Sequence, residues 1–329
     1  LMGELLFICG ISTELFATFK AWLGRIRGGL GMATIASSGI FAAASGSSIA
    51  NTATMGVIAS KEMEKYKYSN VLTSGSIVAG GTLGVLIPPS TVAIVYGMLT
   101  EQSIGQLLMA GLIPGIILIL LYMLTVYVVV KIKPSLAPES TEKVSLKEKI
   151  VSLKSTIWII VLFVIVIGGM YRGIFSPTEA AGIGAFATLI IALIRRKLTM
   201  KTFITAATST IKTTGFLFAI IIMAFILNYF LTITKLPFMI AEFFNTLNAP
   251  VWAIFALIIL MYILMGMIMD AMAMVVVTMP IILPLIIAMD LDLIWFGVII
   301  VLVIEMACIT PPVGINCFVL RGAAPTLKI

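Results

Sequence analysis

The chain has 329 residues, of which 61% are hydrophobic and only 11% are charged, and its mean hydropathy is +1.19. Soluble domains are about 45–50% apolar and about 25% charged, so the composition excludes a soluble protein and predicts an integral membrane protein. The net charge of +7 lies in short Lys and Arg clusters between apolar stretches, a pattern that argues against nucleic-acid binding. The sequence has no His and only three Cys. It therefore offers no His-based catalytic triad, zinc site or disulfide framework, and neither enzyme activity nor a cofactor is expected.

Apolar stretches of about 20 residues predict membrane spans. We expect spans at 70–99, 105–130, 156–172, 179–194, 213–233 and 294–320. The segment from Lys131 to Lys154 is rich in Lys, and Arg195-Arg196-Lys197 follows two spans later, so both are predicted to be cytoplasmic. Residues 199–212 alternate Thr and Lys with apolar positions, which predicts a separate amphipathic helix at the membrane interface.

Two apolar regions do not fit a single span. Residues 29–60 have basic clusters on both sides and small, polar residues near the centre, which predicts a re-entrant hairpin with its tip at Ser45–Asn51 and cytoplasmic ends. Residues 251–289 contain Asp270 and two prolines within an apolar run. Because no Lys or Arg cluster flanks this second region, both of its ends are expected outside.

Each predicted hairpin precedes a span that a proline pair interrupts. Pro88 and Pro89 follow the first hairpin, and Pro311 and Pro312 follow the second. Five predicted spans separate the two hairpins, and an odd number inverts the second copy relative to the first. Two hairpin-plus-broken-helix units of opposite topology are typical of secondary transporters with inverted repeats.

A proline pair frees the carbonyls of the preceding helical turn, because it removes two N–H donors. Such carbonyls, with nearby Ser, Thr and Asn oxygens, suit Na⁺, and helix N-termini at the same gap suit an anionic substrate group. The alternative, that each pair only kinks a helix, is less favoured because both pairs occur in matching contexts. At the first tip, Ser47, Ser48 and Asn51 favour ligand contact over packing between helices by small residues.

Acidic residues within the apolar stretches allow two interpretations. Asp270 is predicted to face the ion site and also to cap the half-helix that follows it. Glu305 either couples protons or pairs with a basic residue, and the sequence leaves both open. Ser176 and Glu179 have the spacing of a capping box, so Glu179 is interpreted as structural.

Several short motifs occur in order along the chain: Gly46-Ser47-Ser48, Ala50-Asn51-Thr52, Gly81-Thr82-Leu83-Gly84, Ile87-Pro88-Pro89-Ser90, Ser176-Pro177-Thr178-Glu179-Ala180-Ala181, Gly266-Met267-Ile268-Met269-Asp270 and Thr310-Pro311-Pro312-Val313-Gly314-Ile315-Asn316. Together they resemble the large (M, or DctM-like) membrane subunit of the tripartite ATP-independent periplasmic (TRAP) transporters. That family has a further span or two before the position of Leu1 and about one more element after that of Ile329. The resemblance therefore implies that the sequence is truncated at both ends.

The resemblance also implies a fold and a function. It implies an all-α, polytopic, elevator-type member of the ion-transporter superfamily in the bacterial inner membrane. Na⁺ is the implied coupling ion, without ATP, and the implied substrate is an organic acid such as a C4-dicarboxylate or a sialic acid. The implied partners are a small four-helix membrane subunit and a periplasmic substrate-binding protein.

The family motifs map ion and substrate contacts onto this chain. The implied Na⁺ ligands are Ser47, Ser48, Asn51 and Gly84 in the first unit and Asp270, Thr310 and Gly314 in the second. Substrate contacts are expected at Ser48, Thr82, Pro88, Pro89, Pro311, Pro312 and Asn316.

The expected domain organisation follows from these units. Residues 1–28 are an arm of the scaffold, 29–100 the first transport unit, 101–250 the scaffold spans with the amphipathic arm, and 251–329 the second transport unit. A stand-alone Na⁺/dicarboxylate carrier of the same superfamily is the main alternative. An ion channel is less favoured, because nothing in the sequence resembles a repeated selectivity filter.

Overall fold

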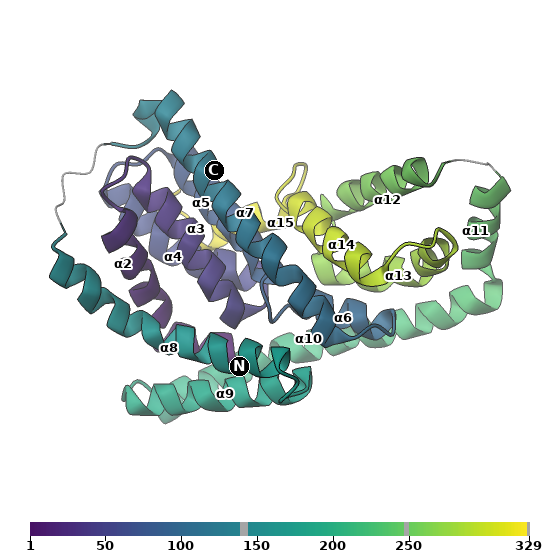
Figure 1. The fold of residues 1–329 in the computed structure, drawn as a ribbon, viewed down its shortest axis with the longest axis horizontal. Helices are drawn as coiled ribbons and strands as arrows, with labels where there is room; N and C mark the ends of the chain where they lie inside the picture. The colour runs from purple at the N-terminus through teal and green to yellow at the C-terminus, as the bar shows by residue number, and fades with distance from the viewer. Residues whose placement is uncertain (139–143, 247–249, 328–329) are drawn as a thin grey trace. The chain divides into compact units, whose positions relative to one another are not determined.

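The computed structural model describes residues 1–138, 144–246 and 250–327 (Figure 1). Over these residues the protein is helical and contains no strand. In this part of the chain, five helices are long and apolar enough to cross a membrane, or up to seven if each of two bent pairs forms one span. The structure thus confirms the predicted class, an all-α polytopic membrane protein. Part of the basic segment from Lys131 to Lys154 lies outside the described residues.

The chain divides into two compact units. Unit 1 comprises Leu1–Ser90, Leu112–Thr210 and Asn316–Ile329, and unit 2 comprises Thr91–Gly111 and Ile211–Ile315. The chain passes from unit 1 to unit 2 just after the first proline pair, and back to unit 1 shortly after the second. Each span that the proline pairs interrupt therefore contributes its first half to one unit and its second half to the other.

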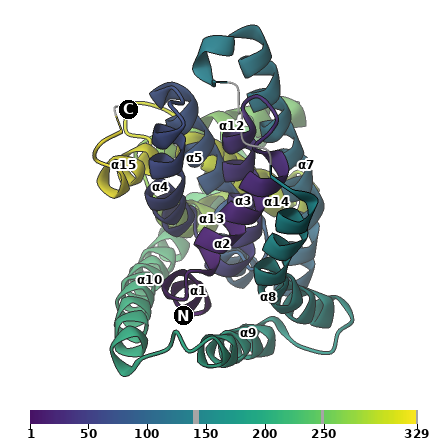
Figure 2. The ribbon, with the colours of Figure 1, turned by 90° about the vertical axis from the view of Figure 1, so that its left-hand side faces the viewer.

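Unit 1 is built around hairpin 1, which we define as α3 (Gly29–Ser45), α4 (Ser48–Lys65) and the turn between them. The unit also contains α1 (Met2–Ile8), α2 (Ile11–Leu23), α5 (Asn70–Leu86), most of α7 (Ile104–Ile132), the 3-10 turn η1 (Pro134–Leu136), α8 (Leu146–Tyr171), α9 (Pro177–Ile194) and nearly all of α15 (Ile315–Ala323). Hairpin 1 packs along α5, and α15 lies against α4 at Gly56 (Figure 2). The predicted first hairpin is confirmed as a helix–turn–helix, with α4 continuing to Lys65.

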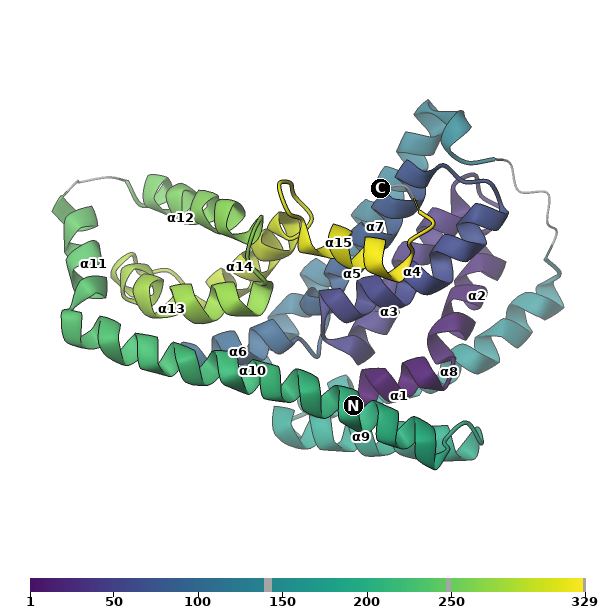
Figure 3. The same cartoon turned by 180° about the vertical axis from the view of Figure 1, so that it is seen from behind.

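Unit 2 is built around hairpin 2, which comprises α12 (Val251–Gly266), α13 (Ala271–Ala288) and the turn between them. The unit also contains α6 (Thr91–Leu99), most of α10 (Met200–Thr234), α11 (Leu236–Thr246) and α14 (Leu293–Ala307). Helix α14 packs along α12, and α6 packs against α13 and α14 (Figure 3). The hydroxyl of the buried Tyr96 on α6 donates to the carbonyl of Leu293 at 2.6 Å and ties α6 to the start of α14.

The N-terminal helices of unit 1 hold hairpin 1 against α8. Helices α1 and α2 meet at 69°, and Gly10 permits the bend because its φ of +73° lies in the left-handed region. Thr18 on α2 donates to the carbonyl of Ser152 on α8 at 2.8 Å and accepts from Thr156 at 2.8 Å. Since α2 also packs against α3, it connects the hairpin to the neighbouring span.

The predicted helix at 199–212 is present, but it is not separate from the span that follows it. Helix α10 runs without interruption from Met200 to Thr234 and contains 35 residues. The threonines in its first part do not break it, because Thr205 and Thr210 donate their hydroxyls to carbonyls four residues earlier, at 2.9 and 2.7 Å. The polar segment is therefore the first part of one long helix, in which residues 215–227 are uniformly apolar.

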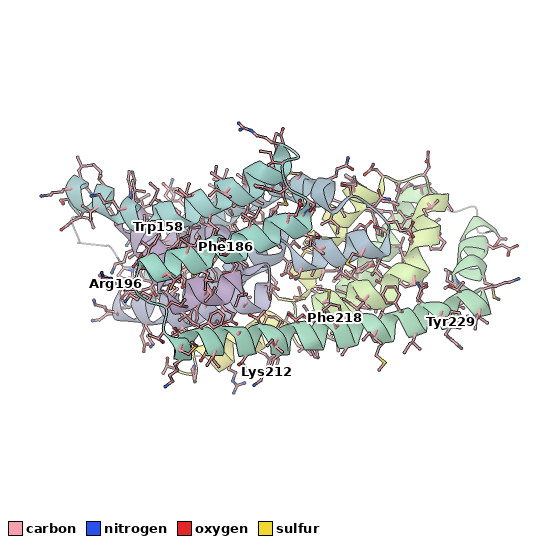
Figure 4. The ribbon with its side chains drawn as sticks, turned by 90° about the horizontal axis from the view of Figure 1, so that it is seen from below. Trp158, Phe186, Arg196, Lys212, Phe218 and Tyr229 are labelled. Carbon is pink, nitrogen blue, oxygen red and sulfur yellow. The ribbon has the colours of Figure 1, made fainter. Side chains whose placement is uncertain are left out.

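Many large apolar side chains of the spans point outward, although others form a buried core. Phe186 on α9 of unit 1 and Phe218 and Tyr229 on α10 are each more than half exposed (Figure 4). Soluble proteins rarely leave apolar surface of this extent open to water. The arrangement fits helices that are surrounded by lipid.

Candidate functional site

The tip of hairpin 1 is a tight turn of two residues. Gly46 ends α3 in the left-handed region at φ +62°, and its N–H donates to the carbonyl of Ala42 at 3.1 Å. Ser47 begins α4 as its N-cap, because its hydroxyl accepts from the N–H of Ala50 at 3.4 Å. The remaining N–H groups of the first turn of α4, including that of Ser48, therefore point toward the tip.

Glycines let α5 approach this tip closely. A Cβ on Gly84 would lie 2.5 Å from the carbonyl oxygen of Ser47 and 3.0 Å from the nitrogen of Ser48. One turn earlier, a Cβ on Gly81 would overlap the hydroxyl of Thr52. The backbone of α5 thus contacts the backbone of the tip at Gly84 and the side chain of Thr52 at Gly81.

The proline pair ends α5 beside the tip. The helix stops at Leu86, and α6 begins only at Thr91. Because Pro88 and Pro89 have no N–H, the carbonyls of Gly84 and Val85 have no helical donor four residues later. Oxygen acceptors are therefore concentrated where α5 meets hairpin 1.

The tip of hairpin 2 contains an acidic residue. Asp270 is the N-cap of α13, and its carboxylate accepts from the N–H of Met272 at 3.0 Å. The carbonyl of Met267, at the same tip, accepts from the N–H groups of Val313 and Gly314 at 3.3 and 3.4 Å. The predicted cap is confirmed. The break after α14 (the non-helical residues 308–314) contacts the second tip, whereas the last turn of α5 contacts the first.

Hairpin 2 also packs closely on the helix that leads to its break. A Cβ on Gly266 would lie 2.6 Å from the Cβ of Ala307 on α14. Tyr262 on α12 is fully buried and lies 2.6 Å, hydroxyl to hydroxyl, from Thr278 on α13, so a hydrogen bond joins the two arms. Thr310, in the break, donates its hydroxyl back to the carbonyl of Met306 at 2.7 Å.

The structure brings most of the predicted site residues together within their own units. In unit 1, Ser47, Ser48, Asn51 and Gly84 lie where hairpin 1 meets α5, and Pro88 and Pro89 follow at the end of that helix. In unit 2, Asp270 and Gly314 belong to the tip and the break that Met267 joins. Thr310, Pro311 and Pro312 lie on the same break, and both prolines are exposed.

Two predicted substrate residues lie elsewhere. The hydroxyl of Thr82 donates to the carbonyl of Ala79 at 2.7 Å and lies 3.4 Å from the hydroxyl of Tyr122 on α7, so it does not join the tip cluster. Asn316 belongs to unit 1, whereas the rest of its motif belongs to unit 2. Its side chain is 1% exposed, and its amide has no hydrogen-bond partner within the described chain.

Sequence reasoning did not identify Ser38 and Thr52. Both are 0% exposed, and their hydroxyls lie against the glycine face of α5. A serine within a run of small residues resembles ordinary helix packing. The sequence does not show that α3 and α4 place these hydroxyls opposite Gly80 and Gly81, because that depends on how the three helices pack.

The acid Glu305 is buried in unit 2. It lies on α14 with 3% exposure, and Cys308 lies within electrostatic reach of both Glu305 and Asp270. Within the described residues, no group of three or more Cys, Asp and Glu side chains is arranged to hold a metal ion. The first tip offers neutral oxygens, and the second adds the carboxylate of Asp270.

Comparisons with known proteins show the family to which this chain belongs. The family model described as "Tripartite ATP-independent periplasmic transporter, DctM component" matches residues 1–329. The C4-dicarboxylate TRAP transporter large permease protein DctM of Pseudomonas aeruginosa is 35% identical over 100% of the chain and 79% of its own length.

Two further relatives bear other substrate names. The sialic acid TRAP transporter large permease protein SiaM of Vibrio cholerae is 30% identical over 97% of the chain and 74% of its own length. The isethionate TRAP transporter permease protein DctMQ of Oleidesulfovibrio alaskensis is 34% identical over 96% of the chain and 49% of its own length. The chain belongs to the DctM family of tripartite ATP-independent periplasmic transporters, and it is a multi-pass membrane transport protein, not an enzyme.

Proposed function

We propose that the chain is the large membrane subunit of a Na⁺-coupled importer of a small organic anion. The observation that carries the proposal is that each hairpin tip contacts the interrupted end of a span within its own unit. Gly84 meets Ser47 and Ser48 in unit 1, and Gly314 meets Met267 in unit 2. Interrupted helices of this kind hold both the coupling ion and the substrate in secondary transporters.

The chemistry at each tip supports Na⁺ as the coupling ion. Unit 1 offers the freed carbonyl of Gly84 together with the hydroxyls of Ser47 and Ser48 and the amide of Asn51. Unit 2 offers Asp270, Thr310 and the backbone around Gly314. Hard oxygen atoms of this type replace the hydration shell of an alkali cation.

The proposed binding of an anionic substrate depends on the N-termini of two helices. Helices α4 and α13 both begin at a tip, and their first N–H groups favour negative charge. The names of the relatives refer to C4-dicarboxylates, sialic acid and isethionate, and all three are anions. An organic acid is the proposed substrate class, with Ser48, Pro88, Pro89 and Asn316 as its proposed contacts in unit 1 and Pro311 and Pro312 in unit 2.

Transport is proposed to proceed by alternating access in an elevator mechanism. Each hairpin, together with the interrupted span that follows it, forms one half of an inverted repeat. The two halves move together, while the spans that lie between them in the sequence form the scaffold. A small membrane subunit and a periplasmic binding protein complete the transporter in the bacterial cytoplasmic membrane. The DctMQ relative supports a membrane partner, because the present chain covers only half of that longer permease.

Uptake into proteoliposomes tests the function. The full transporter, reconstituted with the small subunit and the binding protein, should import a labelled organic acid only when Na⁺ is higher outside. Import that needs Na⁺ but no binding protein would favour the alternative, a stand-alone Na⁺/dicarboxylate carrier. Import that is unaffected when Na⁺ is replaced by choline would overturn Na⁺ coupling.

A further inference from the structure

One end of unit 1 carries basic loops that the proposed function does not use. The first loop, residues 24–28, joins α2 to α3, and the second, residues 66–69, joins α4 to α5. The third, residues 131–138, contains the end of α7 and the turn η1. These basic loops contain no acidic residue, and they carry five exposed basic side chains: Arg25, Arg27, Lys67, Lys131 and Lys133.

Hydrogen bonds hold the three basic loops beside one another. The N–H of Leu30, in the first turn of α3, donates to the hydroxyl of Tyr68 in the second loop at 3.4 Å. The N–H of Ser69, in the second loop, donates to the carbonyl of Leu136 in the third at 3.0 Å. The loops therefore form one surface, and their positive charges are concentrated on it.

The charge of this surface is not balanced by the protein. Within the described residues, four of the five basic side chains, all except that of Arg27, form no ion pair with an acid. By contrast, Lys20 on the neighbouring helix α2 pairs with Glu62 at 2.8 Å. Like charges held close together repel one another, and a negatively charged partner removes that repulsion.

Two exposed isoleucines lie among the cations of the basic loops. Ile26 lies between two arginines and is 42% exposed, and Ile132 lies between two lysines and is 71% exposed. Exposed apolar side chains are unfavourable in water and favourable among acyl chains. A phospholipid places a charged phosphate next to apolar chains, so it complements a surface on which cations flank isoleucines.

The position of Trp22 indicates where the membrane surface crosses this end of unit 1. Trp22 lies on the last turn of α2, one turn before Arg25, and is 46% exposed. Its indole N–H donates to the carbonyl of Lys149 on α8 at 3.3 Å. Tryptophan is enriched at the level of the lipid headgroups. The basic loops therefore lie at the depth where phosphate groups are found.

We propose that the basic loops bind the headgroup of an anionic phospholipid such as phosphatidylglycerol. The cations contact the phosphate, and Ile26 and Ile132 enter the acyl region beside it. Clusters of roughly four to eight Lys and Arg at the ends of membrane helices attract anionic lipid, and each cation contributes roughly fivefold in affinity. The bound lipid fixes the depth of this end of unit 1 in the bilayer. The proposal is independent of the proposed Na⁺ coupling.

Trp22 supplies a local probe of lipid binding. The purified full-length protein, in a variant in which every tryptophan except Trp22 is replaced by Phe, is placed in nanodiscs of phosphatidylcholine with a small fraction of brominated lipid. Bromine quenches the fluorescence of a nearby indole. At equal mole fractions, brominated phosphatidylglycerol should quench Trp22 more strongly than brominated phosphatidylcholine does. Equal quenching by the two lipids would overturn the proposal.

Charge removal should weaken this preference at the basic loops and nowhere else. Lys131→Gln combined with Lys133→Gln should lower the apparent affinity for phosphatidylglycerol roughly 25-fold, the product of two fivefold losses. The matched control is Lys201→Gln combined with Lys212→Gln, which removes the same charge from exposed positions on α10 (Figure 4). The control should bind phosphatidylglycerol as the parent does. An unchanged affinity in the first pair would contradict the proposal.

Two further measurements separate a lipid from a free anion and from a folding defect. Inorganic phosphate should not displace phosphatidylglycerol, and Ile132→Ser should weaken lipid binding several-fold, because the acyl chains contribute to it. Displacement by phosphate would show an ion site and overturn the lipid. If the double lysine variant does not fold, choline chloride added to the parent protein decides, because salt should remove the advantage of the anionic lipid. An advantage that persists at high salt would contradict the charge contacts.

Discussion

Hairpin 1 and hairpin 2 make the same contact with different chemistry. The tip of hairpin 1 has only neutral groups, Ser47, Ser48 and Asn51, and it meets the backbone of α5 through glycine. The tip of hairpin 2 has a carboxylate at Asp270, and its neighbour α14 has a second acid at Glu305. If the proposed Na⁺ sites are correct, a cation at the second tip would be paired with charge, whereas a cation at the first would be held by dipoles alone.

The packing of the two hairpins differs in the same way. In hairpin 1, Gly84 faces backbone atoms of Ser47 and Ser48, which have no room to move aside. In hairpin 2, Gly266 faces the side chains of Ala307 and Met274, and the methionine is flexible. The first tip therefore tolerates an added side-chain atom at its glycine less well than the second does.

The largest expected effect concerns the side of the membrane from which each hairpin can be labelled. Lys61, near the end of α4, and Asp290, just after α13, are both exposed. In a variant without native cysteines, an impermeant maleimide added to intact cells should label Asp290→Cys and not Lys61→Cys, because the hairpins enter from opposite faces. Labelling of both should follow permeabilisation, and the reverse pattern in intact cells would overturn the inverted arrangement.

The next effect tests backbone packing at the first tip. Gly84→Ala should reduce uptake to background and destabilise the fold by about 1–3 kcal/mol, the usual cost of overpacking. Gly75→Ala on the same helix is the control, because a Cβ there meets nothing within 4 Å. Gly266→Ala should have a smaller effect on uptake than Gly84→Ala. Equal uptake by Gly84→Ala and Gly75→Ala would show that the close contact is not needed.

Charge at the second tip should determine the Na⁺ requirement. Asp270→Asn keeps an effective N-cap but removes the charge, so the Na⁺ concentration for half-maximal uptake should rise about tenfold or more. Ser47→Ala at the neutral tip should raise it only a few-fold, with about 0.5–2 kcal/mol lost from the missing cap. If Ser47→Ala shifts the Na⁺ dependence more than Asp270→Asn does, the neutral tip dominates instead.

The smallest effect concerns the end of hairpin 1 that is remote from its tip. Lys20 on α2 pairs with Glu62 on α4 at 2.8 Å, and both side chains are partly exposed. Lys20→Met should lower the free energy of unfolding by only about 0.2–1 kcal/mol, because exposed ion pairs are weak and screened by salt. Thermal unfolding at low and high salt should show that this difference shrinks with salt, and uptake should stay near the wild-type rate.

Local features of the fold could be predicted from the sequence. The two hairpin turns, the cap at Asp270 and the interruptions at the proline pairs each depend on a few neighbouring residues. The capping box of Ser176 and Glu179 is also present, with the carboxylate accepting from the N–H of Ser176 at 2.8 Å. Each of these signals lies within one or two helical turns, where the stereochemistry of Gly, Pro and capping residues is decisive.

Features that depend on contacts between helices could not be predicted. The position of Ser38 opposite Gly80 requires the relative alignment of α3 and α5, which neither segment encodes alone. The continuity of α10 depends on threonine hydroxyls that bond within the helix, whereas the same residues equally suit an exposed segment. The displacement of Thr82 toward Tyr122 likewise depends on how α5 is rotated against α7.

The exchange of half-spans between the units has a consequence for synthesis. Helix α4 leaves the ribosome well before Leu320 and Ala323, the residues that approach its Gly56, because Gly56 and Leu320 are 264 positions apart (320 − 56). Unit 1 therefore lacks part of its packing until α15 has been inserted. Contacts so distant in sequence form late and leave surfaces open in the meantime. A nascent chain halted before α15 should thus be more accessible to membrane proteases at α4 than the finished protein.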